Sequence, residues 1–248
     1  MVYYSWLCAA NSIYDLIRLL MPPKIAIVAA LPREIAALVR GVEPHSTFQE
    51  RGIMLYQLPH AVIVAGGMGS LRATLAFEAA RAMAPIEVVI SVGMAGACSA
   101  GLVVGEVAEA AVVVESRTGE RYTVVSSPHT HVLVSSEAIA GVKDKSRFAE
   151  TYGAAMVDME AATVARLAVA HGLRFRAMKA ISDGHEFEMP SLSQFEDHNG
   201  HFRTGAFAMH TALRPQQWGK AIELGRGSKR ALAKLHEALR EVMAGSAS

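Results

Sequence analysis

Three carboxylic acids stand in stretches that are otherwise apolar or rich in small residues: Glu34, Glu160 and Asp183. Carboxyl groups in such surroundings are candidates for general acid–base chemistry. Each also has an ordinary structural explanation. Glu34 could favour a helix N-terminus through the helix dipole, Glu160 could lie on a solvated helix face, and Asp183 could cap the segment after it. Taken one at a time, the structural explanations are favoured.

The elements that must position these acids are readable as hydrophobic patterns. Short apolar runs rich in β-branched residues predict strands, and apolar residues at helical spacing predict helices. The expected strands are 24–30, 54–58, 61–65, 88–92, 107–114, 155–159 and 175–181, with a hairpin joining the second to the third. The first expected helix begins near residue 34 and runs through Leu38 and Val39. The other expected helices cover 71–83, 160–170, 204–213 and 218–243. His171 and Gly172 close the helix over 160–170.

Two glycine-rich turns are expected directly after strands. The first runs from Gly66 to Ser70 and opens the helix over 71–83, and the second is Gly93, Met94, Ala95 and Gly96. Strands that alternate with helices indicate an α/β fold: a single domain with a mixed, mostly parallel central sheet flanked by helices. Ligands of such sheets bind beyond the carboxyl ends of the strands. The acids and both turns follow strands or begin helices, so we expect them to meet at that edge.

Composition restricts the possible partners. The 248 residues are 52% hydrophobic and carry 24 Lys and Arg against 23 Asp and Glu, so a sizeable core is available without a strong positive field. We therefore expect no nucleic acid and no integral membrane span, and we favour a small-molecule partner. Cys8 and Cys98 lie far apart and form no metal-ligand or disulfide pattern, which suits a reducing cytoplasm.

The first twenty residues are apolar enough to raise the question of a signal peptide or a membrane anchor. Asp15 and Arg18 interrupt the apolar stretch and argue against both. Met21, which precedes two prolines and a clear strand, is a candidate natural start. We therefore divide the chain into an N-terminal extension over 1–22 and a catalytic domain over 23–248.

Four segments, taken together, resemble the nucleoside phosphorylases and the methylthioadenosine/S-adenosylhomocysteine nucleosidases. The stretch from Ile25 to Glu34 is similar to the N-terminal start of the nucleosidases. Gly67-Met68-Gly69 is similar to the loop that binds an anion or water in these enzymes. The 92–96 stretch, with the later 104–107, resembles the second glycine turn and the strand beyond it. The most specific segments are Val157-Asp158-Met159-Glu160-Ala161-Ala162 and Ala180-Ile181-Ser182-Asp183.

The resemblance implies a role for each acid in breaking the bond between a purine and its ribose. Met159 would pack against the sugar while Glu160 accepts hydrogen bonds from its two ring hydroxyls. Asp183, with a pKa raised by burial, would act as general acid at the purine N7. Glu34 would hold and deprotonate the water that attacks the anomeric carbon, as in inverting glycosidases. The implied reaction releases adenine and needs no metal and no organic cofactor.

Whether water or phosphate is the nucleophile depends on a cationic signature that is weak here. Hexameric phosphorylases of bacteria carry an arginine two residues before the second glycine turn and a serine after its first glycine, where this chain has Ser91 and Met94. Arg72, just after Gly69, could reach an anion at the helix N-terminus, although a solvent-facing arginine is the simpler interpretation. We favour hydrolysis, with a phosphate-dependent phosphorylase as the alternative.

The base pocket and the substrate are less specified. Ile139 stands near the position of the aromatic residue that stacks on adenine in the nucleosidases. The segments 187–190, 195–197, 202–204 and 210–215 resemble the hopanoid-associated branch of the family, which is thought to remove adenine from adenosylhopane. Lipid-linked adenosine is therefore a second candidate substrate, and Trp218 would face its tail or lie in the core.

Three other interpretations carry less weight. His129 with His131 and His198 with His201 are close pairs, but no metal-ligand spacing accompanies them. The first glycine turn is an incomplete dinucleotide-binding fingerprint. A nucleoside- or lipid-binding protein without turnover would not need all three acids.

Members of the family are commonly dimers or hexamers, so we also expect a homo-oligomer.

Overall fold

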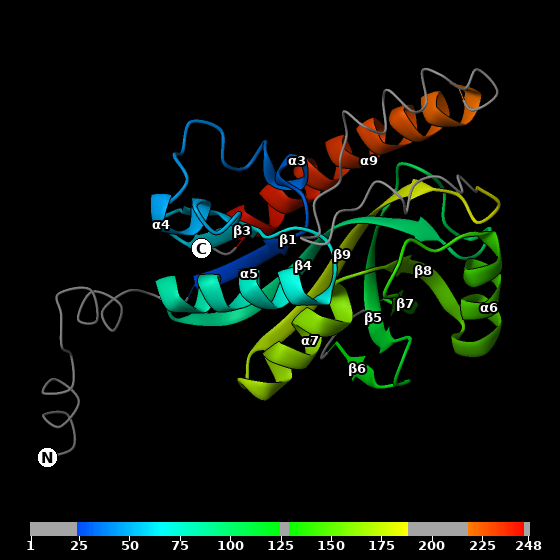
Figure 1. The fold of residues 1–248 in the computed structure, drawn as a ribbon, viewed down its shortest axis with the longest axis horizontal. Helices are drawn as coiled ribbons and strands as arrows, with labels where there is room; N and C mark the ends of the chain where they lie inside the picture. Colours follow the sequence, from blue (N-terminus) through cyan, green and yellow to red (C-terminus); the bar gives the residue numbers. More distant parts are fainter. Residues whose placement is uncertain (1–23, 125–128, 188–217, 246–248) are drawn as a thin grey trace, which may run out of the picture.

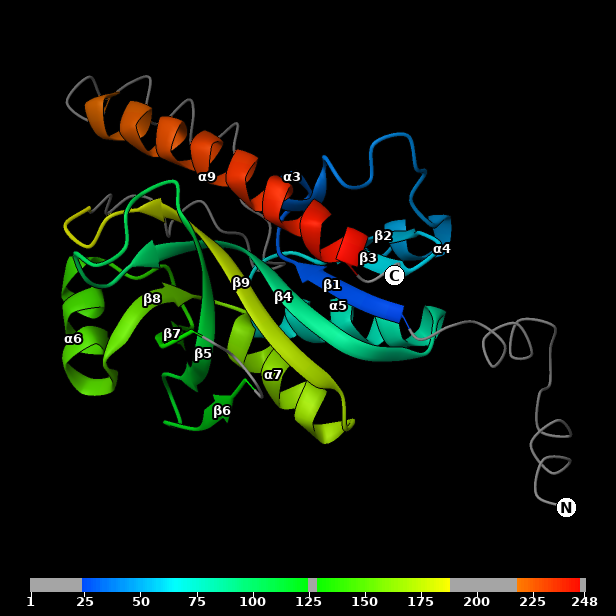
Figure 2. The same cartoon turned by 180° about the vertical axis from the view of Figure 1, so that it is seen from behind.

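The computed structural model describes residues 24–124, 129–187 and 218–245, and these residues build one nine-stranded sheet with helices on both faces (Figures 1 and 2). The expected N-terminal extension, the helix over 204–213, most of the hopanoid-like segments and the pair His198 and His201 lie outside the described residues. The strands are β1 (Lys24–Ala29), β2 (Met54–Gln57), β3 (Ala61–Ala65), β4 (Ile86–Ala97), β5 (Val107–Glu115), β6 (Arg121–Thr123), β7 (His131–Ser135), β8 (Ala154–Asp158) and β9 (Arg174–Asp183).

The sheet follows the order β2-β3-β1-β4-β8-β7-β5-β6, and β9 pairs with both β4 and β5. This second pairing of β9 closes the middle of the sheet on itself. Five strand pairs are parallel and four are antiparallel. The expected mixed α/β sheet is confirmed, but its parallel pairs outnumber the antiparallel ones only slightly, because β2, β6, β8 and β9 each contribute an antiparallel pairing.

The helices are α3 (Pro32–Ile35), α4 (Ser46–Gln49), α5 (Ser70–Met83), α6 (Val142–Tyr152), α7 (Ala161–Ala170) and α9 (Trp218–Gly245). The alanine-rich helix α5 and α7 cover one face of the sheet, where Phe77, Val164 and Ala168 pack against β1 and β3 residues such as Val28 and Val64. Alanine suits this position because it favours the helix and lets it approach the strands closely.

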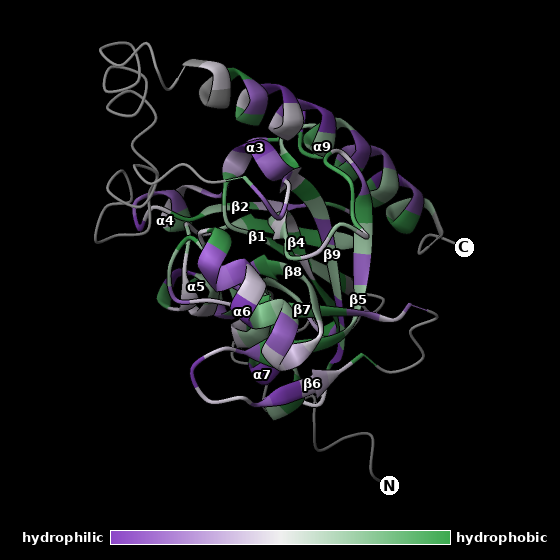
Figure 3. Cartoon of the chain, turned by 90° about the vertical axis from the view of Figure 1, so that its right-hand side faces the viewer, coloured by the Kyte–Doolittle hydropathy of each residue, from purple (hydrophilic) through white to green (hydrophobic). Residues whose placement is uncertain are grey.

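The long helix α9 covers the opposite face, beside α3 (Figure 2). Its buried residues Ala231, Leu235 and Leu239 recur every four positions and contact β-strand residues such as Ile27 and Ile90. Hydrophilic and hydrophobic residues alternate along the helix in Figure 3, as expected for a helix with one buried face. None of the helices in the described residues combines the length and apolar character that crossing a membrane requires.

The prediction that residues 93–96 form a glycine-rich turn is wrong, because these residues belong to a strand. Gly93, Met94, Ala95 and Gly96 lie inside β4 and pair with β9, from Gly93 opposite Lys179 to Gly96 opposite Asp183. The glycines are explained by close contacts of side chains with the strand, described below. The helix expected after β1 is also shorter than predicted, because α3 ends at Ile35.

Candidate functional site

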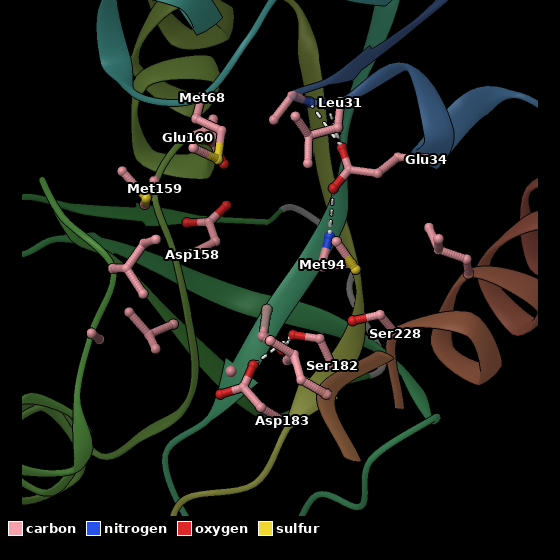
Figure 4. A pocket seen from close by; sticks show the side chains of 18 of the residues that line it. Leu31, Glu34, Met68, Met94, Asp158, Met159, Glu160, Ser182, Asp183 and Ser228 are labelled. Carbon is pink, nitrogen blue, oxygen red and sulfur yellow. Dashed lines mark hydrogen bonds between the residues drawn. The ribbon is translucent and has the colours of Figure 1, made fainter. Parts of the chain in front are cut away.

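A cavity of about 470 Å³ opens at the carboxyl ends of β1, β4, β8 and β9, under the edge of α9 (Figure 4). Glu34, Glu160 and Asp183, which are far apart in the sequence, all line it, and so does Met159. The expectation that the three acids meet at one edge of the sheet is therefore met. Most other lining residues are apolar or small: Ala30, Leu31, Met68, Met94, Ala95, Gly96, Ala138, Ile139, Ala140, Val157, Leu224, Gly225 and Leu232. The remaining ones are charged or polar: Arg33, Lys145, Asp158, Ser182, Ser228 and Lys229.

Glu34 is held by three backbone N–H groups. Its Oε2 accepts hydrogen bonds from Leu31 N at 2.8 Å and Ala30 N at 3.1 Å, and its Oε1 accepts one from Met94 N at 3.1 Å. The first two bonds resemble helix capping, but the third comes from β4 and fixes the carboxyl over the cavity. Burial raises the pKa of Glu34, while these N–H groups and the charge of Lys179 act in the opposite direction.

Gly93 and Gly96 leave room for the acids that line the cavity. A Cβ on Gly93 would lie 3.0 Å from Glu34 Oε1, and Gly93 has a φ of 142°, which side-chain-bearing residues rarely adopt. A Cβ on Gly96 would lie 2.9 Å from both Asp183 Oδ2 and Lys145 Cε. The glycine pattern of β4 therefore reflects close packing of carboxyl groups on the strand.

Glu160 lies at the start of α7, and its Oε1 accepts a hydrogen bond from Gly69 N at 2.8 Å. This bond connects the first glycine turn, with Gly67 and Gly69 at positive φ, to the ribose acid suggested by the sequence. Burial, followed by the nearby charge of Asp158, raises the pKa of Glu160 to about 8. Glu160 is therefore neither solvated nor a simple helix-face residue.

A buried ion pair that the sequence analysis missed lies behind Glu160. Lys179 Nζ on β9 is 2.8 Å from Asp158 Oδ2, and both side chains are 1% exposed. Burial alone would lower the pKa of Lys179, but Asp158 and Glu160 outweigh it and raise the pKa. The signal was a lysine between Met178 and Ala180 in an otherwise apolar strand, where an unpaired charge would be costly.

Asp158 and Ser135 satisfy the first N–H groups of α7. Asp158 Oδ2 accepts from Ala161 N at 3.0 Å, and Ser135 Oγ accepts from Ala162 N at 2.8 Å while donating to Asp158 Oδ1 at 2.6 Å. These bonds replace a side-chain cap, because Glu160, the N-cap residue, turns to Gly69 instead.

Asp183 ends β9 and is held by two donors. Lys145 Nζ lies 2.5 Å from its Oδ2, and Ser182 Oγ donates to its Oδ1 at 2.6 Å. We expected Asp183 to be buried, but its side chain is 18% exposed. It is ion-paired with Lys145, a cation on α6 that the sequence analysis did not single out.

Arg72 does not line the cavity. Its guanidinium donates to the carbonyl oxygens of Gly66 and, at 2.6 Å, Gly52, and its side chain faces a neighbouring cavity on the other side of Met68 and Met159. Ser91, at the position of the phosphorylase arginine, is buried and accepts a hydrogen bond from Lys179 Nζ at 3.0 Å. Neither residue presents a cation to the cavity.

Within 24–124, 129–187 and 218–245, no three His, Cys, Asp or Glu side chains are grouped so that they could hold a metal ion. This range includes His129 and His131. Carboxyl groups such as those of the cavity can transfer protons and accept hydrogen bonds from hydroxyl groups.

The fold is nucleoside phosphorylase-like, and the cavity at the edge of its sheet is lined by carboxyl groups. Residues 122–213 match the family model described as the phosphorylase superfamily, which confirms the resemblance to the nucleoside phosphorylases and nucleosidases. The hopanoid-associated branch is not confirmed by these matches. A search of curated protein sequences finds no match.

Several solved structures share the fold. A methylthioadenosine/S-adenosylhomocysteine nucleosidase of Neisseria meningitidis, solved with methylthio-immucillin-A, aligns with a TM-score of 0.65 and 16% identity over 90% of this chain and 99% of its own. The methylthioadenosine nucleosidase of Arabidopsis thaliana aligns with a TM-score of 0.61 and 17% identity, over 79% of this chain and 97% of its own. The futalosine hydrolase of Helicobacter pylori aligns with a TM-score of 0.58 and 15% identity, over 88% of this chain and 98% of its own. At these identities the likeness concerns the fold.

Proposed function

We propose that this protein is an N-ribosyl hydrolase that cleaves the N-glycosidic bond of a purine nucleoside, a 5′-substituted adenosine in our assignment, and releases adenine. The observation that carries the proposal is the meeting of three acids from three separate segments in one cavity. In Figure 4, Glu34 and Asp183 lie apart along β4 with Met94 between them, and Glu160 lies to one side with Met159. This arrangement leaves room for a nucleoside whose base, sugar and attacking water each meet a different carboxyl group.

Each acid has a distinct task in the proposed reaction. Asp183 is partly exposed, so it can take a proton from solvent and pass it to N7 while the bond from C1′ to N9 breaks. Glu34, fixed by three N–H groups, receives a proton from the water that adds to C1′. Glu160 accepts hydrogen bonds from the ribose hydroxyls, which strengthen as the sugar gains positive charge. The products are adenine and a free ribose derivative.

The surroundings of the glycine segments support water over phosphate as nucleophile. Phosphate sites favour arginine with backbone N–H groups. Arg72 is committed to two carbonyl oxygens outside the cavity, and Lys179 is paired with Asp158. Of the cations that line the cavity, Lys145 is paired with Asp183, so a phosphate would have to bind through Arg33 or Lys229. The phosphate-dependent phosphorylase remains the alternative that the closing measurement below separates from hydrolysis.

The 5′ substituent is assigned by analogy and by the lining. The nucleosidases described above are named for methylthioadenosine and S-adenosylhomocysteine, and one of them binds methylthio-immucillin-A. The apolar side chains Leu31, Met68 and Leu224 in this cavity suit a substituent of that kind. A lipid-linked adenosine is the second substrate candidate, and no described residue favours it specifically.

The wider setting follows the expectations from the sequence. We propose a catalytic domain over 23–248 preceded by an extension over 1–22. We propose a homo-oligomer, because Leu71 and Leu75 on α5 and Val169 on α7 are exposed apolar residues. We propose a cytoplasmic location, because Cys98 is free and buried.

Adenine release from 5′-methylthioadenosine, followed by chromatography, tests the roles. Asp183→Asn and Glu34→Gln should each lower kcat about 10²- to 10⁴-fold, the usual contribution of a general acid or base. Glu137→Gln, the same change at an exposed carboxylate outside the cavity, is the matched control and should release adenine at the normal rate. Unchanged release by Asp183→Asn would refute the assignment of the acid. Tight binding without release by the wild type would indicate a nucleoside-binding protein.

A further inference from the structure

Lys145 is the one lysine among the described cavity residues that is both buried and in direct contact with a proposed catalytic acid. Its side chain is 2% exposed, although it belongs to α6, a helix on the outside of the sheet. Its ammonium lies 2.5 Å from Asp183 Oδ2, 2.8 Å from the carbonyl oxygen of Gly184 and 3.3 Å from that of Phe187. All three acceptors belong to the end of β9 or the segment just after it.

The number of acceptors around Lys145 matches the number of donors of an ammonium group. An ammonium has three N–H donors and no acceptor, whereas a neutral amine has only two N–H groups. Three oxygen acceptors therefore use every donor of a charged lysine. Lys145 has no hydrogen left to bind a purine or a phosphate, so it can act on the substrate only through Asp183 and the 184–187 segment.

The packing around Lys145 leaves its position little freedom. Gly96 of β4 lies against both partners of the pair, since a Cβ there would stand 2.9 Å from Lys145 Cε and from Asp183 Oδ2. Ser182 fixes the other oxygen of Asp183, and Ser182 Oγ also lies 3.3 Å from the carbonyl oxygen of Ala95. The carboxyl group of Asp183 is thus oriented from two sides.

We propose that Lys145 is a positioning residue for Asp183: it orients the carboxyl toward the leaving base and stabilises the carboxylate that remains after the proton has gone to the base. This inference rests on the proposed hydrolysis of a purine nucleoside. A fixed cation beside the developing charge lowers the barrier without reorganisation during the reaction. The contribution concerns departure of the base and not attack by water.

A comparison of two leaving groups separates this role from a merely structural one. Adenine needs a proton at N7 to leave, whereas p-nitrophenolate leaves from a p-nitrophenyl riboside without one. Lys145→Met should lower kcat on 5′-methylthioadenosine at least about 10-fold, part of the contribution of a general acid, and leave kcat on the p-nitrophenyl riboside within about 2-fold. Lys145→Arg, which keeps the charge, should recover part of the lost rate. Lys143→Met, the same change on an exposed residue of α6, is the control.

A double-variant cycle measures whether Lys145 acts through Asp183. In the Asp183→Asn background, Lys145→Met should cause no further loss of adenine release, because the group it positions is already absent. Gly96→Ala, which pushes the pair apart without removing either partner, should reproduce the selective loss on the purine substrate. Thermal unfolding of each full-length variant checks that it is folded under assay conditions.

The outcomes separate the two proposals. Equal losses by Lys145→Met on both leaving groups, or additive losses in the double variant, would overturn the positioning role while leaving the hydrolase assignment intact. A wild-type protein that cleaves no nucleoside would overturn the hydrolase assignment and this inference with it. A loss confined to the purine substrate and absent in the Asp183→Asn background supports the inference.

Discussion

Four carboxyl groups line one cavity, two of them are ion-paired with buried lysines, and this arrangement separates two kinds of acid. Glu34 is buried and Glu160 is half-buried, and burial raises the pKa of each. Asp183 is partly exposed and ion-paired with Lys145, while Asp158 is buried against Lys179. At the scale of single residues, environment and not residue type assigns the roles: a base held by N–H groups, a hydroxyl acceptor and a group supplied with protons from solvent.

The raised pKa of Glu160 predicts a pH dependence of stability. The pKa of this carboxyl group rises from an ordinary value of 4.5 to about 8 in the folded protein. The group therefore binds a proton more tightly in the folded state than in the unfolded state. Its stabilising contribution is therefore complete below the unfolded pKa and is lost as pH rises toward about 8. Glu34, whose pKa is also raised by burial, contributes in the same direction.

Glu160→Gln removes this contribution, so its free energy of unfolding should fall less between pH 5 and pH 8 than that of the wild type. We expect a difference of at least about 1.4 kcal/mol, the equivalent of one pKa unit. Urea unfolding across this pH range measures it. Glu137→Gln, at an exposed carboxylate, should keep the wild-type slope. Parallel slopes for the wild type and Glu160→Gln would contradict the raised pKa.

Gly93→Ala tests the close approach of Glu34 to β4. The added Cβ would lie 3.0 Å from Glu34 Oε1 and would force a φ of 142° on alanine. We expect kcat/KM for adenine release to fall at least about 10-fold, and stability to fall by about 1–3 kcal/mol from backbone strain. Gly119→Ala, also at positive φ but with no atom within 4 Å of the added Cβ, should keep its activity. Full activity of Gly93→Ala would show that adenine release does not depend on the position of the Glu34 carboxyl group against β4.

At the scale of elements, β4 is the strand on which the site is built. It pairs with β1, β8 and β9, and it carries the two glycines that Glu34 and Asp183 contact. Lys179 lies opposite Gly93 in the pairing of β9 with β4 and reaches Asp158 at the end of β8. The buried ion pair therefore joins β8 and β9, two of the three strands that pair with β4.

Lys179→Met should destabilise the protein by about 3–5 kcal/mol, because it leaves the buried carboxylate of Asp158 without its counter-charge. The double variant Lys179→Met with Asp158→Asn should recover part of this loss, since it removes the uncompensated charge as well. Denaturant unfolding measures both, with Lys143→Met as the exposed control. A loss below about 0.5 kcal/mol for Lys179→Met would show that Asp158 is not dependent on this lysine.

The sequence predicts most elements and fails where a charge is buried. The hairpin of β2 and β3, helix α5 and the segments from β8 through β9 agree with their predicted ranges within a few residues. Helix α6 was missed because its buried residues are Phe148 and Lys145, so its inner face does not read as apolar. Strand β7 and the short strand β6 were missed with it.

The same cause explains what was missed in the site. The three acids stand out because small or apolar residues surround them in the sequence, and the family resemblance assigns them roles. Lys145 has meaning only through Asp183, which is 38 residues away, and this contact depends on the tertiary fold. Gly93 and Gly96 were read as a turn because spacing alone does not distinguish a turn from a strand that carries close contacts.

At the scale of the whole molecule, both faces of the sheet contribute to one cavity. Helix α7 brings Glu160 from one face, α9 brings Leu224 and Leu232 from the other, and α6 brings Lys145 from the side. The closed middle of the sheet holds the carboxyl ends of β4, β8 and β9 together. The central claim that follows is that this assembly cleaves a purine nucleoside with water.

The most direct test of that claim is the identity of the sugar product. Purified full-length protein is given 5′-methylthioadenosine, S-adenosylhomocysteine and inosine, each with and without phosphate, and free ribose derivative and ribose 1-phosphate are both quantified. We predict adenine with a free sugar at a rate independent of phosphate, and little base release from inosine. A strict requirement for phosphate with ribose 1-phosphate as product would contradict hydrolysis and identify a phosphorylase.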